Sequence, residues 1–159
     1  MSAILTLMCG IPRCGKTTWI AKNKKDAIIV SPDDIRREIF GHQYHQPANK
    51  FTFAISEAMV IMLLKQNKNV IIDATHMTRN LRSSWYPVVK GTDVKTVIVW
   101  VYADPDPIKN LEICRNRNLD SIEREKVPDS TLDRMASQFE KPDLLTDGWV
   151  SKIITWQNK

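Results

Sequence analysis

Short apolar runs alternate with amphipathic segments along the whole chain. Five apolar runs are typical of buried strands, at residues 4–9, 27–30, 70–73, 94–102 and 149–156. The segments between them predict helices at residues 18–22, 32–40, 48–66, 78–82, 107–116 and 128–140. Because strands alternate with helices, we expect an α/β fold in three layers, with helices on both faces of a mainly parallel five-stranded sheet.

Three details refine the expected helices. The helix at 48–66 is apolar nearly all round over residues 58–64, which predicts that this half is deeply buried. Ser31 is followed three residues later by Asp34, a pattern that matches a capping box at a helix start. Asp106 is expected to cap the helix that begins after it.

Composition is that of an ordinary soluble domain. The 159 residues are most simply one domain, residues 1–159, with 43% apolar and 26% charged residues. No apolar run approaches 18 residues, so no membrane partner is expected. Three cysteines (Cys9, Cys14 and Cys114) cannot build a disulfide framework and indicate a reducing, cytoplasmic location. The net charge of +5 weakly favours a polyanionic partner, and nothing indicates an oligomeric state.

The first strand leads directly into a phosphate-binding pattern. Residues 10–17 read G-x-x-x-x-G-K-T between a strand and a helix, which is the context that a P-loop requires. Lys16 would reach the β- and γ-phosphates of ATP, and the Thr17 hydroxyl would ligate Mg²⁺. The alternative is a glycine-rich turn with a surface lysine. The residues expected to bind ATP are Gly10, Ile11, Pro12, Arg13, Cys14, Gly15, Lys16, Thr17 and Thr18.

A carboxylate and a guanidinium follow the second strand. Asp34 has a capping role, whereas Asp33 has no local duty and lies three residues before Arg36, on one helix face. Asp33 could accept a proton from an attacking hydroxyl, and Arg36 could hold an acceptor phosphate. The alternative is a surface salt bridge on an amphipathic helix.

The loop after the third strand carries further candidates. Asp73, at the end of this strand, is expected either to contact Mg²⁺ through a water molecule or to serve only as a hydrogen-bonding residue. Thr75 and His76 could contact the acceptor, although a lone loop histidine is more often solvated. Arg79 and Arg82 either bind acceptor phosphates or form a solvated basic face.

A charged segment at 115–128 is too polar for a core. It is either a lid that closes over ATP and delivers an arginine, or a charged surface loop. His42, Tyr44 and His45 lack a second cluster, so no zinc site is expected.

Taken together, these motifs resemble the kinase domain of polynucleotide 5′-hydroxyl kinases, within the zeta-toxin/adenylate-kinase-like P-loop kinases. The matching pieces are 9–19, 31–36, 73–80, 114–117, 127–128 and 139–142. The resemblance implies a P-loop NTPase fold with a helical lid, and transfer of the γ-phosphate of ATP to a 5′-OH end of DNA or RNA. By the same resemblance, Asp33 is the general base, Arg36 grips the acceptor's 3′-phosphate, and Lys16 with Arg117 or Arg124 clamps the donor. Magnesium would be held by Thr17, with Asp33 or Asp73 through water.

The sequence departs from that family at two places. Arg13 and Cys14 replace the usual Gly-Ser of the loop, and extra residues lie between Arg117 and Val127. Two other functions stay open: a kinase of a small-molecule hydroxyl such as a nucleoside, modified base, sugar or antibiotic, and a nucleotide-dependent nucleic-acid-binding ATPase or switch.

Overall fold

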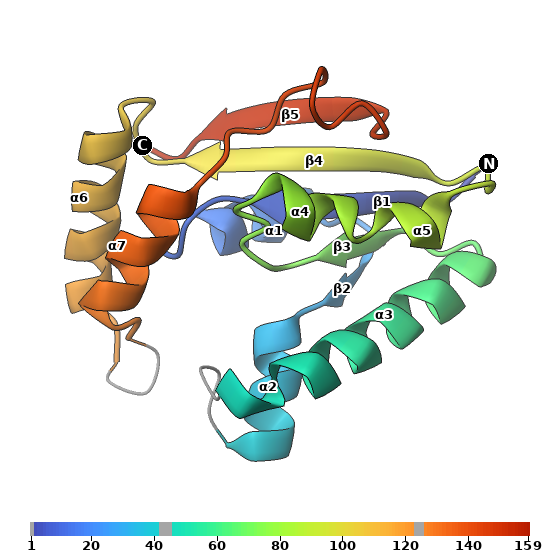
Figure 1. Ribbon diagram of the computed structural model, residues 1–159, viewed down its shortest axis with the longest axis horizontal. Coiled ribbons are helices and arrows are strands. Elements are labelled where there is room, and N and C mark those ends of the chain that lie inside the picture. Colours follow the sequence, from blue (N-terminus) through green and yellow to red (C-terminus); the bar gives the residue numbers. More distant parts are fainter. Residues whose placement is uncertain (1, 42–45, 123–125) are drawn as a thin grey trace.

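The protein is described by a computed structural model over residues 2–41, 46–122 and 126–159. Within these residues five parallel strands form one sheet in the order β2-β3-β1-β4-β5 (Figure 1). The strands are β1 (Ile4–Cys9), β2 (Ile28–Val30), β3 (Val70–Ile72), β4 (Lys95–Tyr102) and β5 (Lys152–Gln157). The predicted α/β fold of the P-loop NTPase type is confirmed, and the described sheet is parallel throughout. The carboxyl ends of all five strands therefore lie at one edge, where ligands bind in such sheets.

Helices cover both faces of the sheet. They are α1 (Lys16–Asn23), α2 (Pro32–Phe40), α3 (Asn49–Lys65), α4 (Arg79–Ser83), α5 (Tyr86–Val89), α6 (Pro107–Leu119) and α7 (Asp129–Gln138), with a 3-10 turn η1 (Gln46–Ala48) before α3. Alternation along β1 separates two cores. Leu5 and Leu7 pack with Val60 of α3, whereas Met8 packs on the opposite face with Ile20 of α1. The three-layer arrangement follows from this alternation.

The expected deep burial of residues 58–64 is wrong. α3 buries a single stripe formed by Thr52, Ser56 and Val60, which are spaced by four residues. Met62 is 62% exposed on the other side of the helix. The helix packs beside α2, η1, β2 and β3, and Leu63 and Leu64 are partly buried against the core, while Met59 stays exposed.

The first part of the predicted lid segment is helical. Residues 115–119 continue α6, so Arg115 and Arg117 belong to a regular helix. α7 packs against α6, and both lie beyond the carboxyl ends of β4 and β5 (Figure 1). Arg124 lies outside the described residues, as do His42, Tyr44 and His45.

Two helix starts form as predicted. The Ser31 hydroxyl accepts a hydrogen bond from the backbone N–H of Asp34 at 3.2 Å. The Asp106 carboxylate accepts from the backbone N–H groups of Ile108 and Lys109, at 2.9 and 3.0 Å. Among the described helices, none combines the length and apolar character needed to cross a membrane.

Candidate functional site

A cleft of about 970 Å³ opens where β1, β2 and β3 end. It is lined by the P-loop, the first turns of α2, the loop after β3, and parts of α6 and α7. The predicted residues Arg13, Lys16, Thr17, Asp33 and Arg36 therefore share one cavity. The cleft also contains Asp73, Thr75 and Arg117. Most of the sequence-predicted site is brought together at this edge of the sheet.

The P-loop is tied to its surroundings by backbone bonds. The Gly10 N–H donates to the Thr75 carbonyl at 2.9 Å, which joins the start of the loop to the segment after β3. Lys16 Nζ donates to the carbonyls of Gly10 and Ile11, both at 3.0 Å. The loop therefore holds the ammonium group at the N-terminus of α1, where backbone N–H groups and the helix dipole attract phosphate.

Gly15 and Arg13, both in the P-loop, have positive φ angles. Gly15 has φ +113°, and a Cβ atom there would lie 2.1 Å from Asn158 Nδ2, so only glycine fits. Arg13 has φ +68°, a conformation that costs a non-glycine residue roughly 1–2 kcal/mol. The Cys14 side chain is fully buried. Cys14 thus faces the core, while Arg13 lines the cleft.

Arg117 braces the loop from α6. Its NH1 group donates to the carbonyls of Arg13 and Cys14, at 3.2 and 3.4 Å. Its NH2 group donates to the carbonyl of Asn158 at 3.0 Å. Arg115 instead pairs with Asp133 of α7 on the outside of the helix pair. Among the described arginines of the expected lid, Arg117 is therefore the one that reaches the P-loop.

Asp33 and Arg36 form an asymmetric ion pair at the start of α2. Arg36 NH1 lies 2.6 Å from Asp33 Oδ1, and the exposed side-chain fractions are 8% for Arg36 and 50% for Asp33. Asp34 pairs with Arg37 at 3.2 Å, and both of those side chains are largely exposed. The alternative of an ordinary surface salt bridge thus fits Asp34–Arg37, whereas the buried Arg36 holds Asp33 at the cleft.

Three carboxylates converge near Lys16. Burial raises the pKa of Asp73, Lys16 lowers it, and the negative charges of Asp33 and Asp34 raise it further. A divalent cation would relieve this repulsion, and carboxylate and hydroxyl oxygens are the donors that Mg²⁺ prefers. The residues present fit a magnesium ion bound by Thr17 and one carboxylate. In the described part of the chain no group of three His, Cys, Asp or Glu side chains would hold a metal, so phosphate oxygens and water would complete the shell.

Neither alternative for His76, a contact with the acceptor or a solvated loop ring, agrees with its position in the structure. The ring is 5% exposed and does not line the cleft. Trp85 Nε1 can only donate, so His76 Nε2 accepts from it at 3.1 Å, and His76 Nδ1 donates to the Met8 carbonyl at 2.6 Å. Burial lowers the pKa of His76 to about 4, so the ring is neutral at physiological pH.

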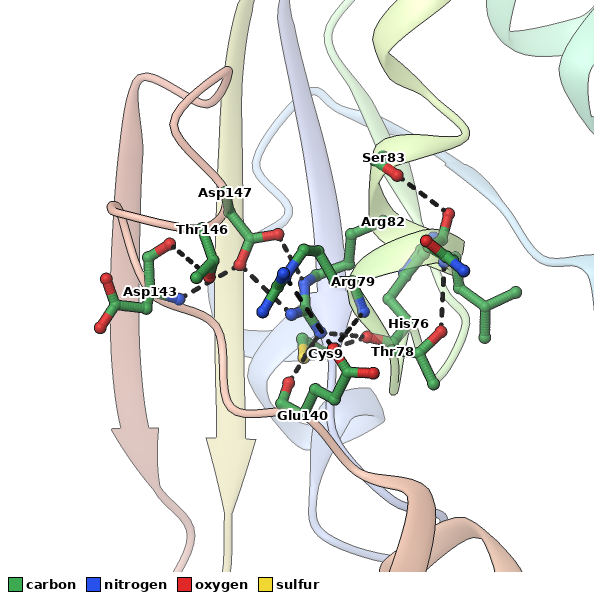
Figure 2. Close-up of polar contacts among 12 residues, drawn as sticks. Cys9, His76, Thr78, Arg79, Arg82, Ser83, Glu140, Asp143, Thr146 and Asp147 are labelled. Carbon is green, nitrogen blue, oxygen red and sulfur yellow. Dashed lines mark hydrogen bonds and ion pairs between the residues drawn. The ribbon is translucent and has the colours of Figure 1, made fainter.

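The prediction of a solvated basic face is wrong for Arg82, whereas the Arg79 side chain is 53% exposed (Figure 2). Arg82 and Asp147 are both fully buried and joined by two bonds, at 3.0 and 3.2 Å. Arg82 NH1 also donates to the carbonyls of His76 and Glu140, both at 2.9 Å. Arg79 Nε lies 4.0 Å from the Glu140 carboxylate, outside the cleft lining. This cluster holds the loop after β3 in place, which is a structural task.

Sequence reasoning missed two contributors to the site. Asp147 is one of two aspartates in the loop at 141–148, and no spacing connects it to Arg82, 65 residues earlier. Asn158 follows β5, and it touches the P-loop only because β5 lies next to β4 in the sheet. Both contacts depend on the folded topology, so no sequence signal could have found them.

Comparison with known proteins places these features in context. A family profile described as an AAA domain matches residues 5–142. The structure is similar to a chain of the Pnkp1/Rnl/Hen1 RNA repair complex, with 24% identity and a TM-score of 0.65, over 86% of this chain and 44% of that one. The chain therefore spans less than half of that protein. No curated protein sequence gives a significant match.

Two further structures show the range of proteins with this fold. A fungal RNA kinase is 13% identical with a TM-score of 0.70, over 100% of this chain and 76% of that one. A gluconokinase from Sinorhizobium meliloti 1021 is 15% identical with a TM-score of 0.53, over 97% of this chain and 81% of that one. At these identities the similarity concerns the fold.

Proposed function

Because this chain belongs to the family described as an AAA domain, and its cleft joins a P-loop to an Asp–Arg pair, we propose that it is an ATP-dependent polynucleotide 5′-hydroxyl kinase. It would transfer the γ-phosphate of ATP to a 5′-OH end of DNA or RNA. The observation that carries the proposal is the asymmetric pair of Asp33 and buried Arg36 in the same cleft as Lys16.

The two members of the pair divide the work on the acceptor. Arg36 engages one oxygen of Asp33 at 2.6 Å, which leaves the second oxygen to accept the proton of the attacking hydroxyl. A transition state for phosphoryl transfer is loose, so a positioned carboxylate is sufficient without being a strong base. The guanidinium fork of Arg36, which lines the cleft, suits bidentate recognition of an acceptor phosphate.

ATP, the phosphate donor, would bind at the P-loop. Lys16 would exchange its bonds to the Gly10 and Ile11 carbonyls for β- and γ-phosphate oxygens, and Arg117 would keep the loop in shape. Thr17, with Asp33 or Asp73 through water, would hold Mg²⁺, which neutralises phosphate charge when bound. Thr75 lines the same cleft and would contact the acceptor.

A phosphorylated polymer fits the charge of the cleft better than a neutral small molecule. Arg36, Arg37 and Arg134 all line it, and the chain carries a net charge of +5. Proteins of the same fold include an RNA kinase and a component of an RNA repair complex. The similar gluconokinase keeps a small-molecule hydroxyl as the second candidate acceptor.

One labelling experiment tests the proposal. The protein is incubated with γ-labelled ATP, Mg²⁺ and, in separate reactions, 5′-OH DNA, 5′-OH RNA, nucleosides and gluconate. Labelled oligonucleotide supports the proposal. Label confined to a small molecule, or release of phosphate alone, refutes it.

Two variants test the division of labour. Asp33→Asn should lower kcat by about 10²-fold or more while ATP binding persists, because it removes the proton acceptor. Asp34→Asn, its matched neighbour, should keep most of the activity. Arg36→Ala should raise the KM for a 3′-phosphorylated acceptor. If Asp34→Asn loses transfer while Asp33→Asn retains it, the assignment of the base is wrong.

A further inference from the structure

A second cavity, of about 350 Å³, lies beside the P-loop and shares no lining residue with the main cleft. It is enclosed by the start of the loop, the end of β4, the beginning of α6 and the end of α7, the two helices that lie beyond the end of β4 in Figure 1. Its size is within the range of small-ligand sites. Nothing in the proposed phosphoryl transfer uses it.

One wall of this cavity is aromatic. Trp100 and Tyr102 project from the same face of β4, and their ring centroids are 4.6 Å apart. Phe139 stacks toward Trp100, with centroids 6.3 Å apart and planes inclined by 26°. All three rings are only half-buried, although their neighbours Val99 and Val101 on the opposite face are fully buried. A planar heteroaromatic ligand would remove the exposed ring surface from water.

Charge at the mouth indicates an anionic substituent on that ligand. Lys141 Nζ lies 5.0 Å from the centre of the Trp100 ring. Among the described residues, no carboxylate lies within ion-pair distance of this ammonium group. An anion held there would be attracted by a cation that the fold leaves exposed.

Polar groups line the other end of the cavity. The Asn110 Oδ1 atom accepts from the backbone N–H groups of Ala103 and Asp104, at 2.7 and 3.3 Å, which directs the amide oxygen to the backbone. Its NH₂ group is thereby left to donate to a ligand. The Asp104 carboxylate lines the same cavity and can accept. Donor and acceptor together suit the edge of a nucleobase.

We propose that this cavity binds one nucleotide, with its base against Trp100 and Tyr102 and its phosphate at Lys141. The nucleotide comes either from solution or from a bound strand, since both offer a base and a phosphate. The site also touches the catalytic loop. Gly10 and Ile11 form part of its wall, and their carbonyls are the groups that hold Lys16.

Tryptophan fluorescence tests this proposal directly, because Trp100 is in the wall. The probes are adenosine 5′-monophosphate and a 5′-phosphorylated thymidine hexamer, which has no 5′-OH to accept a phosphate. The signal is the saturable quenching in the wild type that is absent from Trp100→Phe. Quenching by the monophosphate alone indicates a free nucleotide as ligand, and quenching by the hexamer alone indicates a strand.

Charge variants identify the site that produces the signal. Lys141→Ala should raise the Kd of the probe, measured from the quenching, at least 10-fold, whereas Lys90→Ala should leave this Kd unchanged. Lys90 is the matched control, since its ammonium group lies 6.0 Å from the Tyr86 ring, outside both cavities. Arg36→Ala should leave the quenching unchanged. The proposal is overturned if neither probe quenches Trp100, or if Arg36→Ala abolishes the quenching and Lys141→Ala does not.

Discussion

Lowering the pH from 7.5 to 5.0 should reduce the free energy of unfolding by about 2 kcal/mol through His76 alone. The pKa of this histidine is about 4 in the folded protein, below its ordinary value of 6.5. The unfolded chain therefore takes up a proton near pH 6.5, while the folded chain resists it. The stability that His76 contributes is complete above pH 6.5 and is lost as the pH falls toward 4.

The magnitude follows from the size of this gap. In the unfolded chain the pKa of His76 lies about 1.5 units above pH 5.0, and each unit corresponds to about 1.4 kcal/mol of folding free energy. His76 Nδ1 donates to the Met8 carbonyl and Nε2 accepts from Trp85, so protonation of Nε2 would break the hydrogen bond to Trp85. This arrangement supports a lowered pKa for His76. Asp73 acts with the opposite sign, because its pKa is raised and protonation stabilises its folded form.

Urea unfolding at pH 7.5, 6.5, 5.5 and 5.0 measures the effect. The series is repeated in Asp73→Asn, which removes the opposing carboxylate, and in His76→Gln, which removes the titrating ring. We expect the loss to persist in Asp73→Asn and to shrink in His76→Gln. An equal loss in wild type and His76→Gln would refute the assignment to His76.

Three other variants probe the remaining architecture. Arg82→Met should destabilise the fold by about 3–5 kcal/mol in urea unfolding, because Asp147 would stay buried without its partner, and adding Asp147→Leu should recover part of that loss. Arg13→Gly should stabilise the fold by about 0.5–1 kcal/mol by removing left-handed strain, while Arg13→Ala, which keeps the strain, should give no such gain. Arg117→Ala should raise the KM for ATP about 10-fold in steady-state assays with little change in the acceptor's KM, and an unchanged KM for ATP would remove its bracing role.

The fold and the positions of Lys16 and Asp33 in the cleft could be predicted from the sequence, because they depend on local sequence patterns. The apolar runs mark the strands, the P-loop pattern fixes the position of Lys16, and Ser31 marks the start of the helix that carries Asp33. Chain continuity alone then places these residues at one edge of a parallel sheet.

The errors concern partners that are distant in sequence. His76 looked like an exposed loop histidine, yet its environment is set by Met8 and Trp85. Arg82 looked like a surface arginine because Asp147 gives no local signal. Burial of a polar residue depends on which other segments arrive beside it, and periodicity within one segment does not encode that information.

The position of β1 has a consequence for the order of events during folding. This strand ends in the P-loop and occupies the middle of the sheet, yet Leu5 pairs with Val70 and Ile4 pairs with Lys95. Closing such long loops slows folding, and at about 5–20 residues per second a ribosome needs several seconds to produce the second partner strand. The strand that leads into the P-loop is thus synthesised before its partners β3 and β4, and its pairing is completed late. Until β3 and β4 have been synthesised, the apolar residues of β1 can be shielded from water only by transient contacts.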